Sequence, residues 1–200
     1  DSVADNVFTS QACSMINDGD YAIVSNSTYA NTGGMWVTNR TDHTGNPNGG
    51  FLLINVTLSD AAADDKGRVL MIKKEIDIDE SFCPGVLYNF SLWASQLARR
   101  QQLPSSFEFE VVGFDKNNVR SVLGTVNTGV MKDYEMDTWT NYGITFDPGY
   151  SERIELYVYN TGQPGSGNDV VIDDVLLTTC NPSVNVFADY PERDVEVKCG

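Results

Sequence analysis

Two adjacent aspartates, Asp173 and Asp174, interrupt an otherwise apolar run, and something must balance their charge. Residues 168–177 read as a strand, and successive side chains of a strand point to opposite faces, so one of the two carboxylates is expected to face the core. An unpaired buried carboxylate costs several kcal/mol, and the chain has only 13 Lys and Arg for 28 Asp and Glu. A hard divalent cation such as calcium is therefore the expected partner. The alternative that stays open is a carboxylate satisfied by backbone N–H groups.

Further oxygen ligands for such a cation lie in predicted loops. The segments 17–20, 41–42 and 168–169 are rich in the carboxylate and amide oxygens that calcium prefers. Segment 17–20 is not an EF-hand, because the ligand spacing and the terminal glutamate of that motif are missing. The predicted structural calcium site draws on these acidic residues: Asp18, Asp20, Asp42, Asp173 and Asp174.

The chain contains a single histidine, His43, which limits the catalysis it could perform. A Ser-His-Asp triad would need His43, but no G-x-S-x-G motif is present, and the adjacent Asp42 cannot by adjacency supply the triad geometry. Glycine-rich loops that cradle phosphate are also absent from the sequence. The sequence therefore predicts no catalytic residue, and a glycoside-active enzyme that uses two carboxylates is the less favoured alternative.

Aromatic side chains could form a platform for a carbohydrate ligand. Trp93, Tyr157 and Tyr159 are the outward members of alternating runs, although packing is the more ordinary use of such residues. The candidates in chain order are Tyr29, Trp36, Trp93, Tyr142, Tyr157 and Tyr159. Of these, the predicted ligand platform consists of Trp36, Trp93 and Tyr142.

The net charge of −15 and the isoelectric point of about 4.2 argue against two classes of partner. Nucleic acids and anionic membrane surfaces both attract basic patches, and the sequence contains none. No segment approaches the roughly 20 apolar residues that span a bilayer. We therefore expect neither nucleic-acid binding nor membrane insertion.

Four widely spaced cysteines indicate the cellular compartment. Cys13, Cys83, Cys180 and Cys199 form no C-x-x-C pair, which argues against a zinc site or a redox motif. Such spacing is more typical of two disulfides formed in an oxidising compartment. The sequence therefore predicts a secreted or cell-surface protein, and four buried free thiols are the alternative.

A period of two along most of the chain predicts the fold. Residues 107–111 and 152–159 alternate apolar and polar side chains, as half-buried strands do, and clusters of Gly, Pro, Asn and Asp separate the strands. Many short strands without intervening helices favour an all-β protein, a two-sheet antiparallel jelly-roll sandwich. We expect this sandwich over residues 1–182, with residues 183–200 forming one further strand or beginning a following module.

Several short motifs, taken in order, resemble MAM-type modules, which are adhesive extracellular jelly-roll sandwiches. They are Trp36, Thr41-Asp42-His43-Thr44-Gly45, residues 50–55, residues 83–93, and residues 167–175 followed by Cys180. A similar order of motifs occurs in large secreted surface proteins of gliding and gut bacteria. The resemblance covers roughly residues 13–182, and Cys199 lies beyond its pattern.

The MAM-like resemblance has consequences for the cysteines and the acidic residues. It implies a Cys83–Cys180 disulfide, which would leave Cys13 and Cys199 as the second pair. It also implies that Asp42, Asp173 and Asp174 lie at one edge of the sandwich, where related jelly rolls often hold a structural calcium ion.

Taken together, the sequence predicts a non-catalytic, calcium-stabilised binding or adhesion module outside the cell. Its expected partner is a glycan or a cell-surface protein, and we expect a monomeric module within a larger chain. The main alternative is a purely structural spacer domain of a long surface protein.

Overall fold

The computed structural model describes residues 2–3, 9–10, 17–30, 36–37, 39–56, 63–79, 82, 85–98, 102–131, 138–163 and 165–179. Its strands are β1 (Ser2–Val3), β2 (Thr9–Ser10), β3 (Asp20–Val24), β4 (Phe51–Ile54), β5 (Val69–Asp77), β6 (Tyr88–Gln96), β7 (Ser106–Phe114), β8 (Arg120–Val130), β9 (Thr140–Phe146), β10 (Arg153–Asn160) and β11 (Val170–Thr179). A short 3-10 helix, η1, covers Ser27–Ala30. No helix in these ranges is long and apolar enough to cross a membrane.

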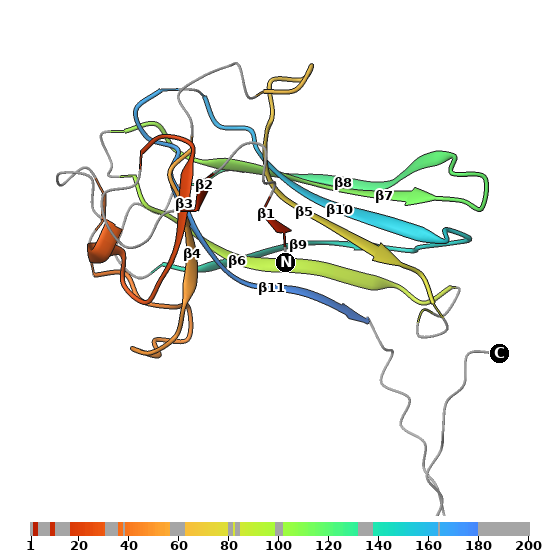
Figure 1. The fold of residues 1–200 in the computed structure, drawn as a ribbon, viewed down its shortest axis with the longest axis horizontal. Coiled ribbons are helices and arrows are strands. Elements are labelled where there is room, and N and C mark those ends of the chain that lie inside the picture. Colours follow the sequence, from red (N-terminus) through yellow and green to blue (C-terminus); the bar gives the residue numbers. More distant parts are fainter. Residues whose placement is uncertain are drawn as a thin grey trace, which may run out of the picture.

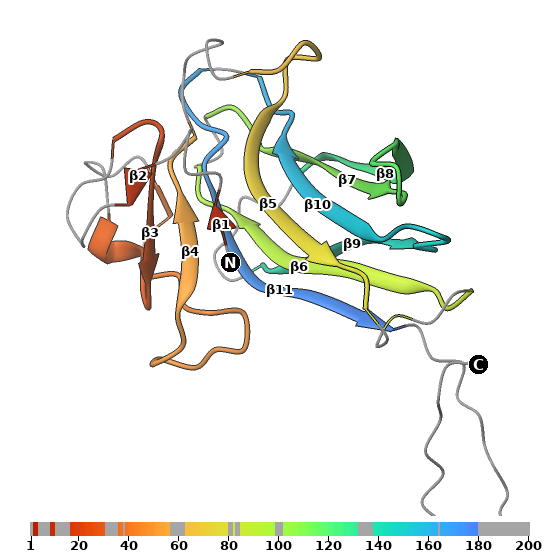
Figure 2. The same ribbon diagram turned by 45° about the vertical axis from the view of Figure 1, so that its right-hand side comes forward.

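The strands form two sheets that face each other (Figures 1 and 2). The five-stranded sheet has the order β1-β5-β10-β7-β8, and the six-stranded sheet has the order β2-β3-β4-β11-β6-β9. The pairings are antiparallel except for the short β2–β3 pair. The orders β5-β10-β7-β8 and β4-β11-β6-β9 are those of a jelly roll, in which the chain passes repeatedly from one sheet to the other. The predicted all-β jelly-roll sandwich is therefore confirmed.

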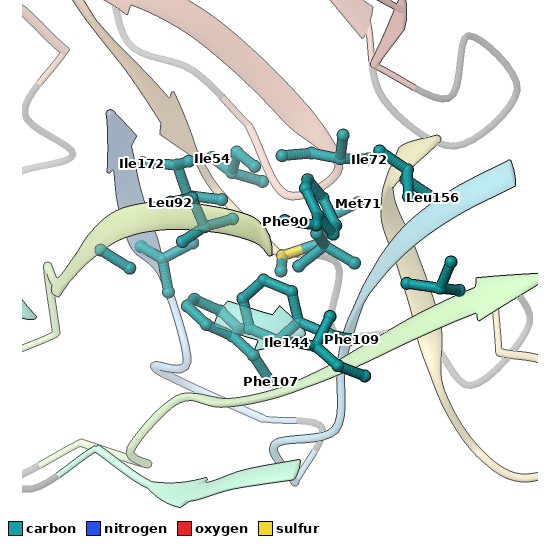
Figure 3. Packing of buried hydrophobic residues seen from close by; sticks show 14 of the residues in the cluster. Ile54, Met71, Ile72, Phe90, Leu92, Phe107, Phe109, Ile144, Leu156 and Ile172 are labelled. Carbon is teal, nitrogen blue, oxygen red and sulfur yellow. The ribbon is translucent and has the colours of Figure 1, made fainter. Parts of the chain in front are cut away.

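Strict alternation on the strands builds the core between the sheets. In β7, Phe107 and Phe109 are fully buried, and the ring of Phe109 meets that of Phe90 from β6 edge-to-face, with centroids 5.6 Å apart. Figure 3 shows these rings with Met71 of β5 and neighbouring aliphatic side chains between the sheets. Apart from Ser106 and the buried Val112, the outward positions of β7 and β10 carry charged or aromatic residues, so the same alternation that fills the core also sets the composition of an outer face.

The outer face of the six-stranded sheet is also partly buried, by a second, smaller core. This small core comprises Ala22, Val24, Trp36, Phe51, Leu53, Leu97 and Val171. As a result, Val170, Val171 and Ile172 at the start of β11 are all buried, whichever face they point to. Such a continuous apolar run is what a strand covered on both faces requires.

A β-bulge changes the setting of the adjacent aspartates. The register of β11 against β6 shifts between Asp173 and Leu176, and Asp174 has a left-handed backbone with φ of 42°. Asp173 lies opposite Trp93 on the outer face, whereas Leu177 returns to the main core opposite Phe90. One carboxylate of the pair is buried, as expected, but it is that of Asp173 on the outer face, and the bulge turns Asp174 away from the main core towards solvent.

The proposed boundary between residues 182 and 183 lies outside the described residues, as does the segment 183–200.

Candidate functional site

The lone histidine and the two adjacent aspartates come together at the β11 bulge. The backbone N–H of His43 donates to Asp173 Oδ2 at 3.0 Å, and His43 Nδ1 lies 3.2 Å from the same oxygen. His43 Nδ1 is also 3.5 Å from Asp174 Oδ2. Asp173 Oδ1 accepts the backbone N–H of Asp174 at 2.8 Å. Asp173 is thus buried with two backbone N–H donors and the Nδ1 atom of His43 around its carboxylate, whereas half of the Asp174 side chain is exposed.

Aromatic rings hold the imidazole of His43 in place. The ring of Trp93 stacks on it with centroids 4.7 Å apart, and Trp139 approaches edge-on at 6.4 Å. Trp139 in turn contacts Phe51 of the small core. The side chain of His43 is only 14% exposed, so the residue packs into the protein and fixes the loop against β6 and β11.

The five acids predicted to bind calcium do not form one cluster. Of the described His, Cys, Asp and Glu side chains, the group whose potential ligand atoms lie within 4.8 Å of one another is His43, Asp173 and Asp174. Asp20 is buried and accepts the backbone N–H of Asn17. Asp18 is exposed in the turn before it.

Asp42 has a local role in its own loop. Its carboxylate accepts the Thr44 hydroxyl and the Asn46 backbone N–H, both at 2.8 Å. Slight desolvation opposes ionisation, but these donors outweigh it and lower the pKa of Asp42. A Cβ at Gly49 would lie 2.1 Å from Asp42 Oδ2, so glycine is needed for the chain to pass this close to the carboxylate.

The surroundings of Asp173 fit a calcium ion poorly. Its two oxygens already accept N–H donors, and the third group in the cluster is an imidazole nitrogen, whereas calcium prefers oxygen ligands. These contacts match the alternative that the sequence left open, in which amide donors satisfy the carboxylate. A cation in this position would have to displace His43 from Asp173.

Two of the three predicted platform residues point away from solvent. Trp36 is 2% exposed within the small core, and its Nε1–H donates to Asp169 Oδ2 at 2.8 Å. Tyr142 is partly buried against the main core and meets Phe107 edge-to-face. Trp93 is partly exposed, but His43 stacks on its ring. The assignment of Trp36 as a ligand platform is corrected by its burial, because a sugar cannot reach a fully covered indole.

The carboxylate that receives Trp36 is itself buried. Asp169 is 5% exposed and also accepts the backbone N–H of Val56 at 3.0 Å. Burial, with a smaller contribution from the negative charge of Asp18, raises the pKa of Asp169 to about 7, although both N–H donors oppose the rise. Asp169 therefore joins the small core to the start of β11 through a carboxyl group that titrates near neutral pH.

A more open group of aromatic and polar side chains lies on the outer face of the five-stranded sheet. Tyr157 and Tyr159 are consecutive outward residues of β10, and their rings stack with centroids 5.7 Å apart. The guanidinium of Arg68 lies 3.9 Å from the ring centroid of Tyr159, and Lys73 Nζ lies 5.7 Å from that of Tyr157. Both tyrosines are partly exposed. We call this surface the tyrosine face.

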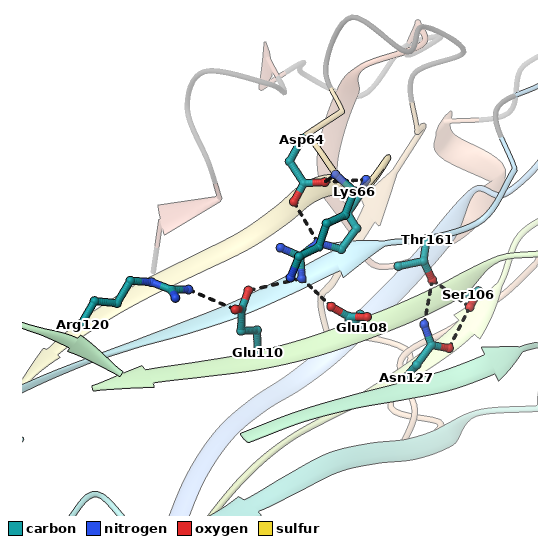
Figure 4. A network of polar contacts seen from close by, with 9 residues as sticks. Asp64, Lys66, Ser106, Glu108, Glu110, Arg120, Asn127 and Thr161 are labelled. Carbon is teal, nitrogen blue, oxygen red and sulfur yellow. Dashed lines mark hydrogen bonds and ion pairs between the residues drawn. The ribbon is translucent and has the colours of Figure 1, made fainter. Parts of the chain in front are cut away.

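Ion pairs fix the side chains at one end of the tyrosine face (Figure 4). Arg68 Nε donates to Asp64 at 2.8 Å, and the same guanidinium pairs with Glu108 and lies 3.2 Å from Glu110 Oε2. Arg120 of β8 reaches the other oxygen of Glu110 at 3.0 Å. The Arg68 and Glu110 side chains are only 8% and 4% exposed, so this pair is buried beneath its neighbours.

The other end of the tyrosine face repeats the pattern. Arg153 donates to Glu155 at 2.8 Å, and Lys73 lies 3.6 Å from Glu155. Both cations also pair with the exposed Glu75. The hydroxyl of Tyr157 donates to the second oxygen of Glu155. Cross-strand pairing brings these residues together, since Glu155 faces Glu75 and Tyr157 faces Lys73 between β10 and β5.

Burial keeps the tyrosine hydroxyls protonated. Desolvation, with the nearby Glu110 carboxylate, raises the pKa of Tyr159 to about 12. Desolvation and the hydrogen bond to Glu155 raise the pKa of Tyr157 further. At neutral pH both residues therefore present neutral hydroxyl groups beside fixed charges.

The sequence identified part of the tyrosine face. Alternation marked Tyr157 and Tyr159 as outward residues, but the selected platform did not include them. Arg68 was missed because it lies in the loop before β5 and meets Glu108 and Glu110 some 40 residues later. The outward glutamates of β7, Glu108 and Glu110, were a usable signal, because adjacent outward acids on one strand favour cations on the neighbouring strands.

The predicted disulfides cannot be placed, because Cys13, Cys83, Cys180 and Cys199 all lie outside the described residues.

Comparison with known proteins finds similarity in structure alone. No protein-family model and no curated protein matches the sequence. Solved structures with similar folds include the CBM22-1 and GH10 modules of Clostridium thermocellum xylanase 10B with xylohexaose, at 17% identity and a TM-score of 0.43 over 70% of this chain and 24% of that one. The CBM22-1 xylan-binding domain of Paenibacillus barcinonensis Xyn10C has 10% identity and a TM-score of 0.36, over 55% of this chain and 65% of that one. TmCBM61 in complex with β-1,4-galactotriose has 16% identity and a TM-score of 0.40, over 79% and 81% of the two chains. The aligned part of this chain spans less than two thirds of the first two structures, and at these identities the likeness assigns no ligand to it.

Proposed function

We propose that this protein is a non-catalytic module that binds a glycan outside the cell through the tyrosine face. The observation that carries the proposal is the stacked Tyr157–Tyr159 pair, partly exposed and flanked by ion-paired arginine and glutamate side chains. The stacked pair lies on the outer face of the five-stranded sheet, whereas the opposite sheet has part of its outer face covered by the small core.

The chemistry of the tyrosine face suits a sugar ring. A pyranose has an apolar side of C–H groups and a rim of hydroxyls, so it favours a surface that combines aromatic area with fixed hydrogen-bonding groups. Tyr157 and Tyr159 supply the aromatic area and two protonated hydroxyls. The ion pairs lock Arg68 and Glu110 before the ligand arrives, which reduces the entropy lost on binding.

The same ion pairs argue against hydrolysis of the bound glycan. Glycosidases need one carboxyl group to give and one to accept a proton or a glycosyl group. On the tyrosine face, Glu108, Glu110 and Glu155 each have at least one carboxylate oxygen paired with an arginine or lysine side chain. These carboxylates therefore act as partners of the cations and hold the face in shape.

Substitutions on β10 test the proposal. Tyr157→Ala or Tyr159→Ala should each weaken binding to a glycan selected on an array by at least about tenfold, as expected for an aromatic residue at the centre of an interface. Tyr150→Ala is the matched control, because Tyr150 is 95% exposed in the turn before β10 and away from the stacked pair. Titration calorimetry gives the dissociation constants.

The outcomes distinguish a glycan site on the tyrosine face from a site at the His43 cluster and from a spacer that binds no glycan. Loss of binding in Trp93→Ala, with no change in the two β10 variants, would place the site at the His43 cluster instead. A protein that binds no glycan on the array would be a structural spacer, and the proposal would be wrong.

A structural calcium ion is a separate question, and removing metal with EDTA answers it. The sequence predicts a lower melting temperature in EDTA that added calcium restores and that Asp42→Ala or Asp174→Ala abolishes. The contacts around Asp173 favour the other result, because N–H donors already satisfy its oxygens. We therefore expect EDTA to leave the melting temperature unchanged. A calcium-dependent rise would contradict this expectation.

A further inference from the structure

We infer that the ligand of the tyrosine face is a neutral glycan and that anionic polysaccharides are excluded, an inference that rests on the proposed function. The observation behind it is the state of four cations on this surface, Arg68, Lys73, Arg120 and Arg153, each of which is already paired with carboxylates. Recognition of uronate, sulfate or phosphate groups depends on arginine or lysine side chains whose charge is available to the ligand.

The arginines at the Tyr159 end of the face are paired with carboxylates. Arg68 contacts the carboxylates of Asp64, Glu108 and Glu110, and its side chain is only 8% exposed. Arg120 pairs with the same buried Glu110. An anionic sugar that took Arg68 would leave Glu110 buried with one half-exposed partner, and an uncompensated buried charge is strongly unfavourable.

Lys73 and Arg153, the remaining cations of the face, are also paired with carboxylates. Lys73 and Arg153 each contact both Glu75 and Glu155. The cations of the face, Arg68, Lys73, Arg120 and Arg153, therefore meet a slightly larger set of carboxylates: Asp64, Glu75, Glu108, Glu110 and Glu155. The surface is close to electroneutral, on a chain whose net charge of −15 repels polyanions at a distance.

Hydroxyl groups, in contrast, can join this network without breaking it. Each guanidinium has five N–H donors and each carboxylate about four lone-pair sites, so ion-paired side chains retain both donors and acceptors. A sugar hydroxyl donates and accepts at once, and it carries no charge that would compete for the cations. The Tyr157 hydroxyl, which already donates to Glu155, can still accept from a sugar, and the neutral hydroxyl of Tyr159 can donate and accept.

Affinity electrophoresis with soluble polysaccharides tests the inference on the intact chain. The neutral probes are xylan, mixed-linkage β-glucan, galactan and galactomannan, and the anionic probes are polygalacturonate, alginate and heparin. We expect retardation by at least one neutral probe and by none of the anionic ones. Calorimetry with the retarding probe should give a dissociation constant that changes less than twofold between low and high salt, since no counterions are released.

Variants assign the result to the face and distinguish the two levels of the proposal. Tyr157→Ala should abolish retardation by the neutral probe, and Tyr150→Ala should retain it, with circular dichroism confirming that both variants are folded. Retardation by polygalacturonate or heparin that is lost in Tyr157→Ala would overturn the inference and leave the proposed function intact. Retardation by no probe of either class would overturn the proposed function itself.

Discussion

Replacing Arg68 with alanine should lower the free energy of unfolding by about 3 kcal/mol, because it removes a cation from a buried ion pair. Glu110, which is buried, would keep Arg120 as its remaining cation, and Glu108 and Asp64 would lose their pairing with Arg68. The variant also loses the guanidinium packed on Tyr159. Urea unfolding at neutral pH, followed by tryptophan fluorescence, measures the change.

Arg120→Ala is the matched control for Arg68. Arg120 contacts the same glutamate, but its side chain is 51% exposed, and exposed ion pairs contribute at most about 1 kcal/mol. Equal losses in the two variants would show that burial of the Arg68–Glu110 pair does not determine its energy. A loss confined to Arg68→Ala would show that it does.

Stability should fall as the pH rises through the range in which Asp169 titrates. The folded-state pKa of Asp169 is about 7, above the ordinary value of 3.8, so between these values the folded state binds more protons than the unfolded state. Asp169 therefore contributes to the free energy of unfolding at the acid end of this window, and the contribution is lost as the pH rises towards 7. The pKa difference corresponds to roughly 4 kcal/mol.

Two variants isolate Asp169 from the other titrating groups. Asp169→Asn cannot titrate, so the difference in unfolding free energy between it and the wild type should change across this pH window. Trp36→Phe removes the N–H donor to Asp169 Oδ2. Loss of this donor favours the neutral acid, so it should raise the pKa of Asp169 further and extend the window to higher pH. If the wild type and Asp169→Asn show parallel pH profiles, Asp169 does not titrate in this window.

Local periodicity was sufficient to predict the jelly-roll sandwich and much of its core. In β7 and β10, alternation alone places Phe109 and Leu156 inward and Tyr157 outward, because a strand with one covered face has no other way to bury its apolar residues. The same rule failed just after Asp173, where a bulge shifts the register before Leu176 and no residue in the sequence announces it.

Contacts between distant segments could not be predicted from the sequence. The burial of Trp36 depends on a loop that folds over the six-stranded sheet, and its partner Asp169 lies 133 residues away. Likewise, His43 reaches Asp173 across 130 residues. Single-residue signals mark such groups as candidates, but only the tertiary fold decides which of them meet.

The interlocked charges of the tyrosine face constrain how its specificity could be altered. Arg68 pairs with both Glu108 and Glu110. A single substitution at any of these three residues, made to create a new ligand contact, would therefore destabilise the fold. Diversification of this surface should therefore proceed through compensated double substitutions, or begin at the half-exposed Arg120 and Glu75 on its margin. Libraries designed to redirect the module toward another glycan should therefore vary Arg120 and Glu75 first.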